Sequence, residues 1–223
     1  MAEKLNRLGL RRPEDLVLHL PLRYEDETRI TPVREALPGV EAQFEVEVVD
    51  CDIAYRPRRQ LVARVRDVAD PGAQLVLRFL NFYPSQQKHL QPGNRLRIFG
   101  EPRGGFFGTE IIHPRTRAAR EGDLLPPALT PVYPTTAGLA QGVLRRLIAQ
   151  ALERVDLGET LPPGVWQAMG LPGFGDAVRQ LHQPPPGLDA TGLERALAPA
   201  WRRIAHDELL AQQMSLRRAY EAR

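Results

Sequence analysis

Aromatic and arginine side chains gather in a few short stretches of this 223-residue chain, where they could bind unstacked bases and phosphates. Leu80, Phe82 and Tyr83 directly follow an apolar run, and aromatic rings that leave a basic surface can stack on bases. Arginine presents a planar fork to phosphate oxygens and can also stack on a base. The same chemistry is offered by Tyr55, Arg56, Arg58, Arg59, Arg78, Arg103 and Phe106.

The arginines also have a plainer explanation. The net charge is only +3, and lysine occurs only at positions 4 and 88, so nearly all cations are arginine. A GC-rich genome, which also favours alanine, proline and glycine, would give the same bias. Solvated turn and edge residues would account for individual members of the set. The clustering is therefore more specific evidence for nucleic-acid binding than the arginine content.

The sequence contains no recognisable catalytic motif. No Gly-rich loop ends in Gly-Lys-Ser/Thr, and no His-Glu-x-x-His pair is present. The five histidines are scattered, and Cys51 is the only cysteine, which excludes an internal disulfide and fits a reducing cytoplasm. We therefore expect a cytoplasmic binding module with no catalytic residue, metal or cofactor in this chain.

Five strand-like runs should position the candidate residues. Apolar residues alternate with polar ones over residues 43–48, 61–66, 75–79, 96–100 and 107–112, and a short helix is expected over 84–90. This order suits a five-stranded β-barrel of the oligonucleotide-binding (OB) kind. Such barrels bind ligands at the loop after strand one, here residues 52–58, at the loop after strand four, and on the face of strands two and three. The candidate residues fall in these places, with Arg64 and Arg66 beside Arg78, whereas Phe79 should point inward.

Helices are expected on both sides of the barrel. Apolar spacing predicts helices over residues 3–20, 139–155, 174–181 and 199–223, and prolines favour an extended strap over 115–136. Residues 19–26 are a charged connector that would pack Tyr24 on the barrel, or a His–carboxylate site. The expected fold class is α+β, with an N-terminal helical segment (1–40), an OB barrel (41–116) and a strap with a helical region (117–223).

Several short motifs resemble the bacterial RecG family of ATP-dependent DNA helicases. HLPLRYED at residues 19–26 resembles the segment that precedes the family's wedge domain, and FLNF at 79–82 with EIIHP at 110–114 resembles the wedge itself. LTPVYPTTAGL at 129–139 is similar to the family's strap, and DELLAQQMSL at 207–216 to the run toward the motor. The resemblance covers almost the whole chain.

The resemblance implies that the chain is the N-terminal, junction-binding part of a helicase that acts in replication fork reversal and branch migration, during DNA repair and recombination. The implied partners are branched DNA, meaning forks and Holliday junctions, and two C-terminal helicase lobes that bind ATP and magnesium. The family tends to carry an aromatic where this chain has Leu80, so two alternatives stay open for the strand-splitting group: Phe82 with Tyr83, or Leu80 as an aliphatic wedge. A protein-interaction scaffold built on the same barrel is the alternative function.

Overall fold

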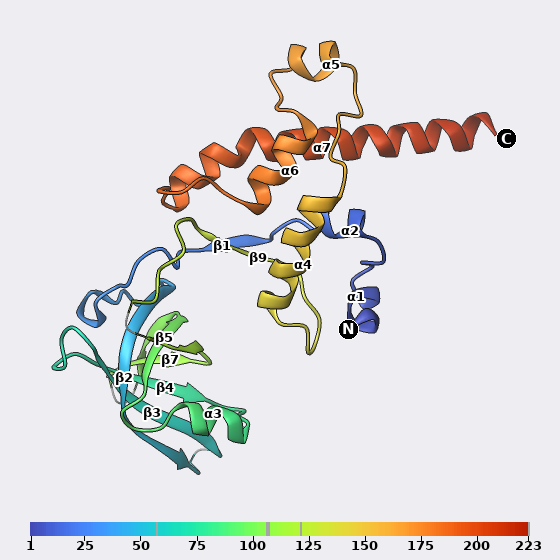
Figure 1. The fold of residues 1–223 in the computed structure, drawn as a ribbon. Helices are drawn as coiled ribbons and strands as arrows, with labels where there is room; N and C mark the ends of the chain where they lie inside the picture. Colours follow the sequence, from blue (N-terminus) through green and yellow to red (C-terminus); the bar gives the residue numbers. More distant parts are fainter. Residues whose placement is uncertain (57, 106–107, 121, 223) are drawn as a thin grey trace. The chain divides into compact units, whose positions relative to one another are not determined.

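The computed structural model describes residues 1–56, 58–105, 108–120 and 122–222. The chain divides into two compact units, one formed by residues 26–127 and the other by residues 1–25 together with 128–223 (Figure 1). The sequence boundaries at residues 40 and 116 stay a prediction, because spatial units need not end where sequence segments do.

A seven-stranded mixed sheet is the framework of the unit 26–127. The strand order is β6-β7-β4-β3-β2-β5-β8, with β4 and β7 parallel and the other neighbours antiparallel. All five predicted strands are present, and a helix lies where one was expected. The elements are η1 (Val33–Glu35), β2 (Ala42–Ala54), β3 (Gln60–Asp67), β4 (Gln74–Phe79), α3 (Pro84–His89), β5 (Arg95–Gly100), β6 (Pro102–Gly105), β7 (Gly108–Ile112) and β8 (Arg115–Ala118).

The hydrogen-bonded order leaves β6 and β8 as the two edges of this sheet over the described residues. An α+β fold is therefore confirmed, while a closed five-stranded barrel stays a prediction. The short edge strand β8 was not predicted. It falls inside the Pro- and Arg-rich segment that was expected to be only an extended strap.

The core of this unit follows from the period-two pattern. Phe44 and Val46 on β2 are fully buried, as are Leu77 and Phe79 on β4. Side chains of alternate residues point to the same face of a strand, so Phe79 continues the inward row of its strand. The prediction that Phe79 points inward is confirmed, because its side chain is 1% exposed.

A β-bulge near the middle of β2 reverses which residues face the core. The register with β3 shifts between Val48 and Asp50, so one extra residue is inserted into β2. After the shift, the odd-numbered Cys51 and Ile53 pack against the core, and the polar Asp52 is exposed. The strand continues to Ala54, so the prediction that a loop begins at Asp52 was wrong.

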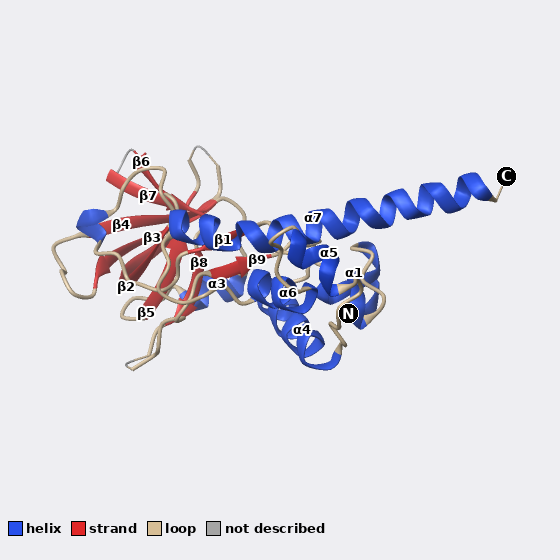
Figure 2. Cartoon of the chain, turned by 90° about the horizontal axis from the view of Figure 1, so that it is seen from above, coloured by secondary structure: helices blue, strands red, loops and turns tan. Residues whose placement is uncertain are grey.

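The second unit is mostly helical (Figure 2). Its helices are α1 (Ala2–Arg7), α2 (Pro13–Val17), α4 (Gln141–Arg154), α5 (Pro163–Ala168), α6 (Phe174–His182) and α7 (Ala190–Glu221). The helical stretch predicted over 3–20 is two short helices, because Gly9 adopts φ +79° between them, a conformation that favours glycine. Helix α7 begins earlier than predicted, because the Asp189 side chain accepts a hydrogen bond from the Gly192 N–H and caps it.

The charged connector belongs to this second unit. Strand β1 (Arg23–Glu25) pairs with β9 (Thr130–Val132), and the Tyr24 hydroxyl donates to the Leu181 carbonyl at 2.7 Å. Tyr24 packs in the apolar cluster of α6 and α7, so the prediction that it packs on the barrel was wrong. The strap and the connector thus hold each other by strand pairing.

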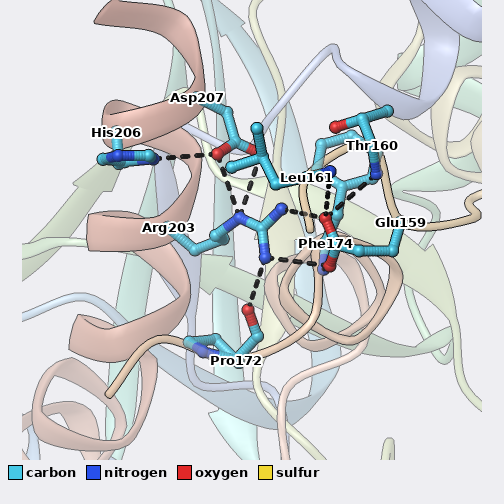
Figure 3. A network of polar contacts seen from close by, with 8 residues as sticks. All are labelled: Glu159, Thr160, Leu161, Pro172, Phe174, Arg203, His206 and Asp207. Atoms are coloured by element: carbon cyan, nitrogen blue, oxygen red, sulfur yellow. Dashed lines mark hydrogen bonds and ion pairs between the residues drawn. The ribbon is translucent and has the colours of Figure 1, made fainter. Parts of the chain in front are cut away.

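A buried arginine fastens one loop of this unit to α7 (Figure 3). Arg203 is 0% exposed, and its guanidinium donates to Glu159, Asp207 and the Pro172 carbonyl. Residues 158–173, which contain α5, include no buried residue. This loop is therefore held mainly by the polar contacts of one side chain from α7.

Candidate nucleic-acid interface

Four residues that follow β4 form a hollow with an arginine from the β2–β3 loop. Leu80, Asn81, Phe82 and Tyr83 line it together with Arg59, and its cavity volume is about 310 Å³. The hollow lies where β4 ends and α3 begins. No carboxylate lines it, so its electrostatic character comes from the arginine.

Phe82 and Tyr83 are placed differently in this hollow. The Phe82 ring is half-buried against the core of the sheet, and the Arg59 guanidinium lies 4.5 Å from its centroid in a cation–π contact. Tyr83 is 75% exposed at the N-cap of α3, where its backbone N–H donates to the Gln86 side chain at 3.0 Å. The start of α3 therefore exposes Tyr83 to solvent, whereas the Phe82 ring packs against the core of the sheet.

The loop after β2 carries the other free cations of the candidate set. Tyr55 is 70% exposed, and Arg56, Arg58 and Arg59 are exposed. Among the described residues, none of these three arginines makes an ion pair with a carboxylate. Arginines without an ion-pair partner keep their full charge available to a phosphate, and Arg59 keeps its charge although its guanidinium also lies over the Phe82 ring.

Arg78 does not have this freedom. Its guanidinium donates to both carboxylate oxygens of Glu110 at 3.0 and 2.9 Å, and to the Gln60 side chain at 3.2 and 2.9 Å. Gly105 makes room for this arrangement, because a Cβ there would lie 2.4 Å from the Glu110 carboxylate. Arg78, which was predicted to bind DNA, is part of an intramolecular network that holds β3, β4 and β7 together.

Arg64 and Arg66 of the predicted face, and Arg103 of the loop after strand four, are also paired. Arg64 donates to Asp50, Arg66 to Glu47 at 2.8 Å, and Arg103 to Glu101 at 3.1 Å. The hydrogen bonds to Asp50 and Glu101 raise the pKa values of Arg64 and Arg103 above their already high ordinary value. Phe106, the last predicted residue, lies outside the described residues.

A larger groove covers the outer face of β2, β3 and β4. Its volume is about 840 Å³. The lining residues are Asp50, Asp52, Ala54, Arg56, Gln60, Val62, Arg64, Gln74, Leu75, Val76 and Arg78. Across the strands, Val62 lies between Asp52 and Arg78, so an apolar floor is flanked by opposite charges.

Sequence reasoning missed the partners Gln60 and Glu110 and the acidic rim of this groove. Alternation along β3 and β7 places these residues on the outer face, but only the register shows which arginine each one meets. The described residues hold no group of three His, Cys, Asp or Glu side chains suited to a metal ion. Burial raises the pKa of the Cys51 thiol to about 11, so this thiol stays protonated at neutral pH.

None of the described helices combines the length and apolar character needed to cross a lipid bilayer. This finding concerns the described residues alone.

The chain is similar to known proteins over almost its whole length. The chain is 42% identical to the ATP-dependent DNA helicase RecG of Escherichia coli (strain K12) over 97% of its own length, and 24% identical to that of Thermotoga maritima over 99%. It spans 31% and 28% of the length of these two relatives. The solved structure of RecG bound to a three-way DNA junction shares the fold, with a TM-score of 0.64 and 22% identity over 99% of this chain and 30% of that one.

The family description of the RecG wedge domain matches residues 1–155, which include the whole sheet, the hollow beside Arg59 and the strap. Since this match covers well over half of the 223 residues, the chain belongs to the RecG wedge domain family.

Proposed function

We propose that this chain binds branched DNA and splits its strands, as the junction-binding part of a RecG-type helicase in fork reversal, branch migration, repair and recombination. The observation that carries the proposal is the exposed Tyr83 in the same hollow as Phe82, whose ring is covered by Arg59, in a member of the wedge family. Exposed rings stack on bases while unpaired arginines bind phosphates. Helicase lobes of the whole protein would bind ATP and magnesium and drive the movement.

Tyr83 is our choice for the group that meets the junction. Its ring is far more exposed than the side chains of Leu80 and Phe82, which are half-buried. A base pair that opens against this ring would exchange its stacking partner for the tyrosine. Tyr55, Arg56 and Arg58 extend the same surface, so they would hold the backbone of the separated strand.

We also propose that the sheet is closed as an OB barrel by one bent strand. Only Glu101 separates β5 from β6, β5 pairs with β2, and β6 pairs with β7. Gly100 supports the bend, because a Cβ there would lie 2.6 Å from the Ile111 side chain. Residues 95–105 would then act as a single strand four between strands one and five.

We propose a cytoplasmic location as well. The proposed DNA ligand and the single, protonated thiol of Cys51 support it.

The test is a comparison of a three-way junction with a duplex of the same length. Tyr83→Ala should weaken junction binding by about 1–3 kcal/mol, the usual cost of removing one base stack. Tyr220→Ala is the matched control, because Tyr220 is 82% exposed on α7 in the other unit. Equal affinity of the wild-type chain for junction and duplex would contradict the strand-splitting role.

The salt dependence of binding tests the arginines. Arg56→Ala with Arg58→Ala should lower the slope of log K against log salt by about 0.7 for each phosphate of the single strand that is no longer bound. Arg217→Ala should leave the slope unchanged, since Arg217 is ion-paired to Glu221 on α7. A protein-interaction scaffold would show no salt-dependent DNA binding at all.

A further inference from the structure

We propose that the groove on the outer face of β2, β3 and β4 binds one unpaired base that carries an exocyclic amine, such as cytosine, with Asp52 accepting this amine and Arg56 holding a phosphate of the same strand. This inference rests on the proposed DNA-binding function and names a subsite within it. The groove would select a base, whereas Tyr83 and the hollow would act in strand separation.

The size and floor of the groove fit a flat ring. The volume of about 840 Å³ falls within the range of roughly 300–1,000 Å³ that is usual for sites that take small ligands. Val62 and Val76 lie on neighbouring strands and supply apolar surface at its floor. A nucleobase has two apolar faces and a polar edge, so one face can lie on the valines while the edge meets the rim.

The charges of the groove argue against a phosphate at its centre. Arg64 is neutralised by Asp50, and Arg78 is held by Glu110 and Gln60. The Asp52 side chain is exposed, and among the described residues its carboxylate makes no hydrogen bond or ion pair. A phosphate placed beside this carboxylate would be repelled, whereas an N–H donor would be accepted.

The same carboxylate selects among bases. Aspartate accepts a hydrogen bond from the N4 amine of cytosine. Thymine presents its O4 acceptor at the equivalent position, so two acceptor oxygens would face each other and no hydrogen bond would form. The single strand continues toward Arg56, an exposed cation of the groove without an ion pair among the described residues. The nucleotide thus meets a carboxylate at its base and a guanidinium at its phosphate.

The experiment measures the anisotropy of labelled 12-nucleotide strands of dC and of dT with the full 223-residue chain. The wild type should bind dC about five- to tenfold more tightly than dT, which corresponds to the lower end of the discrimination of about 1–3 kcal/mol from one good base contact. Asp52→Asn should reduce this preference below about twofold, because an amide serves both bases, and should leave the salt slope unchanged. Asp176→Asn removes an equal charge from an exposed position on α6 and should retain the preference.

Three results would overturn the assignment. Equal binding of dC and dT by the wild type removes base selection, and a preference that survives Asp52→Asn places the base elsewhere. Tighter binding of both strands by Asp52→Asn, with a steeper salt slope, means that a phosphate occupies the groove. The junction preference and the weaker junction binding of Tyr83→Ala are measured separately, so either proposal can fail while the other stands.

Discussion

Replacing Arg203 with methionine tests how the second unit holds its longest loop. Methionine has a similar length and no charge, so the change removes the polar contacts and keeps most of the packing. The guanidinium donates to Glu159 at 3.0 Å, to both oxygens of Asp207 at 3.0 Å and to the Pro172 carbonyl at 2.9 Å. The change removes all of these contacts at once.

The magnitude follows from burial on the two sides of the network. Breaking a buried ion pair by removing one partner costs about 3–5 kcal/mol, because a charge is left uncompensated. Here Arg203 is 0% exposed, but the Glu159 and Asp207 side chains are 24% and 17% exposed and would recover some hydration. We therefore expect a decrease near the lower limit, about 3 kcal/mol in the free energy of unfolding of this unit.

Tryptophan fluorescence during urea unfolding is a selective assay for this prediction. The chain has two tryptophans, Trp166 and Trp201, and both belong to the unit formed by residues 1–25 and 128–223. Trp166 also reports on the site directly, because its ring lies 5.8 Å from the Arg203 guanidinium. Arg202→Met is the control, since Arg202 precedes Arg203 on α7 and is exposed.

Two further measurements test whether the contacts of Arg203 hold the loop of residues 158–173. Residues 158–173 should exchange their amide hydrogens faster in Arg203→Met, since they have no buried residue to hold them. In the wild type, Arg203 lowers the pKa of Glu159 from 4.5 to about 2, so this stabilisation is complete above pH 4.5 and is lost as the pH falls through 2. An Arg203→Met protein within about 1 kcal/mol of Arg202→Met would refute the reasoning.

Two other perturbations test the packing of each unit. Gly105→Ala should displace the Glu110 carboxylate from Arg78 and destabilise the sheet by about 1–3 kcal/mol, measured by circular dichroism; unchanged stability would contradict the close contact. His182 donates to a carbonyl of α2 and accepts from the Tyr133 hydroxyl, and burial lowers its pKa. Stability should be complete above pH 6.5 and fall below it, so the urea midpoint should decrease from pH 7.5 to pH 5.5, and a constant midpoint would exclude this role.

The strand positions were predictable because each core strand repeats a simple chemical pattern. Apolar alternation on β2, β3 and β4 requires only that one face be buried. The structure places β3 and β4 where the pattern predicts them, and β2 includes its predicted run but continues past the bulge to Ala54. Pairing between β1 and β9 was not predictable, since each is three residues long and its partner is more than 100 residues away in the sequence. Helix α5 was missed for a related reason, because it has no buried face that would impose a helical period.

The clustering of arginines was predictable, but the role of each arginine was not, and the bulge in β2 shows why. An unbroken alternation would place Val49 opposite Arg64, whereas the inserted residue places Asp50 there. One extra residue therefore converts an apparent phosphate ligand into half of an ion pair. The same shift turns Asp52 outward into the groove beside Val62.

It follows that binding roles on this sheet depend on register more than on residue type. Arg64 and Arg78 lie on β3 and β4 with carboxylate partners across the strands. Arg56 and Arg58 lie beyond the last paired residues of β2 and make no ion pair in the part of the chain that the structure describes. Cations beyond the paired strands stay available to a phosphate, and cations within the sheet hold its strands together. The interface we propose is therefore basic in the loop next to Tyr83 and nearly neutral along the groove. This distribution of charge is suited to a single strand whose phosphates bind at the loop and whose base binds in the groove.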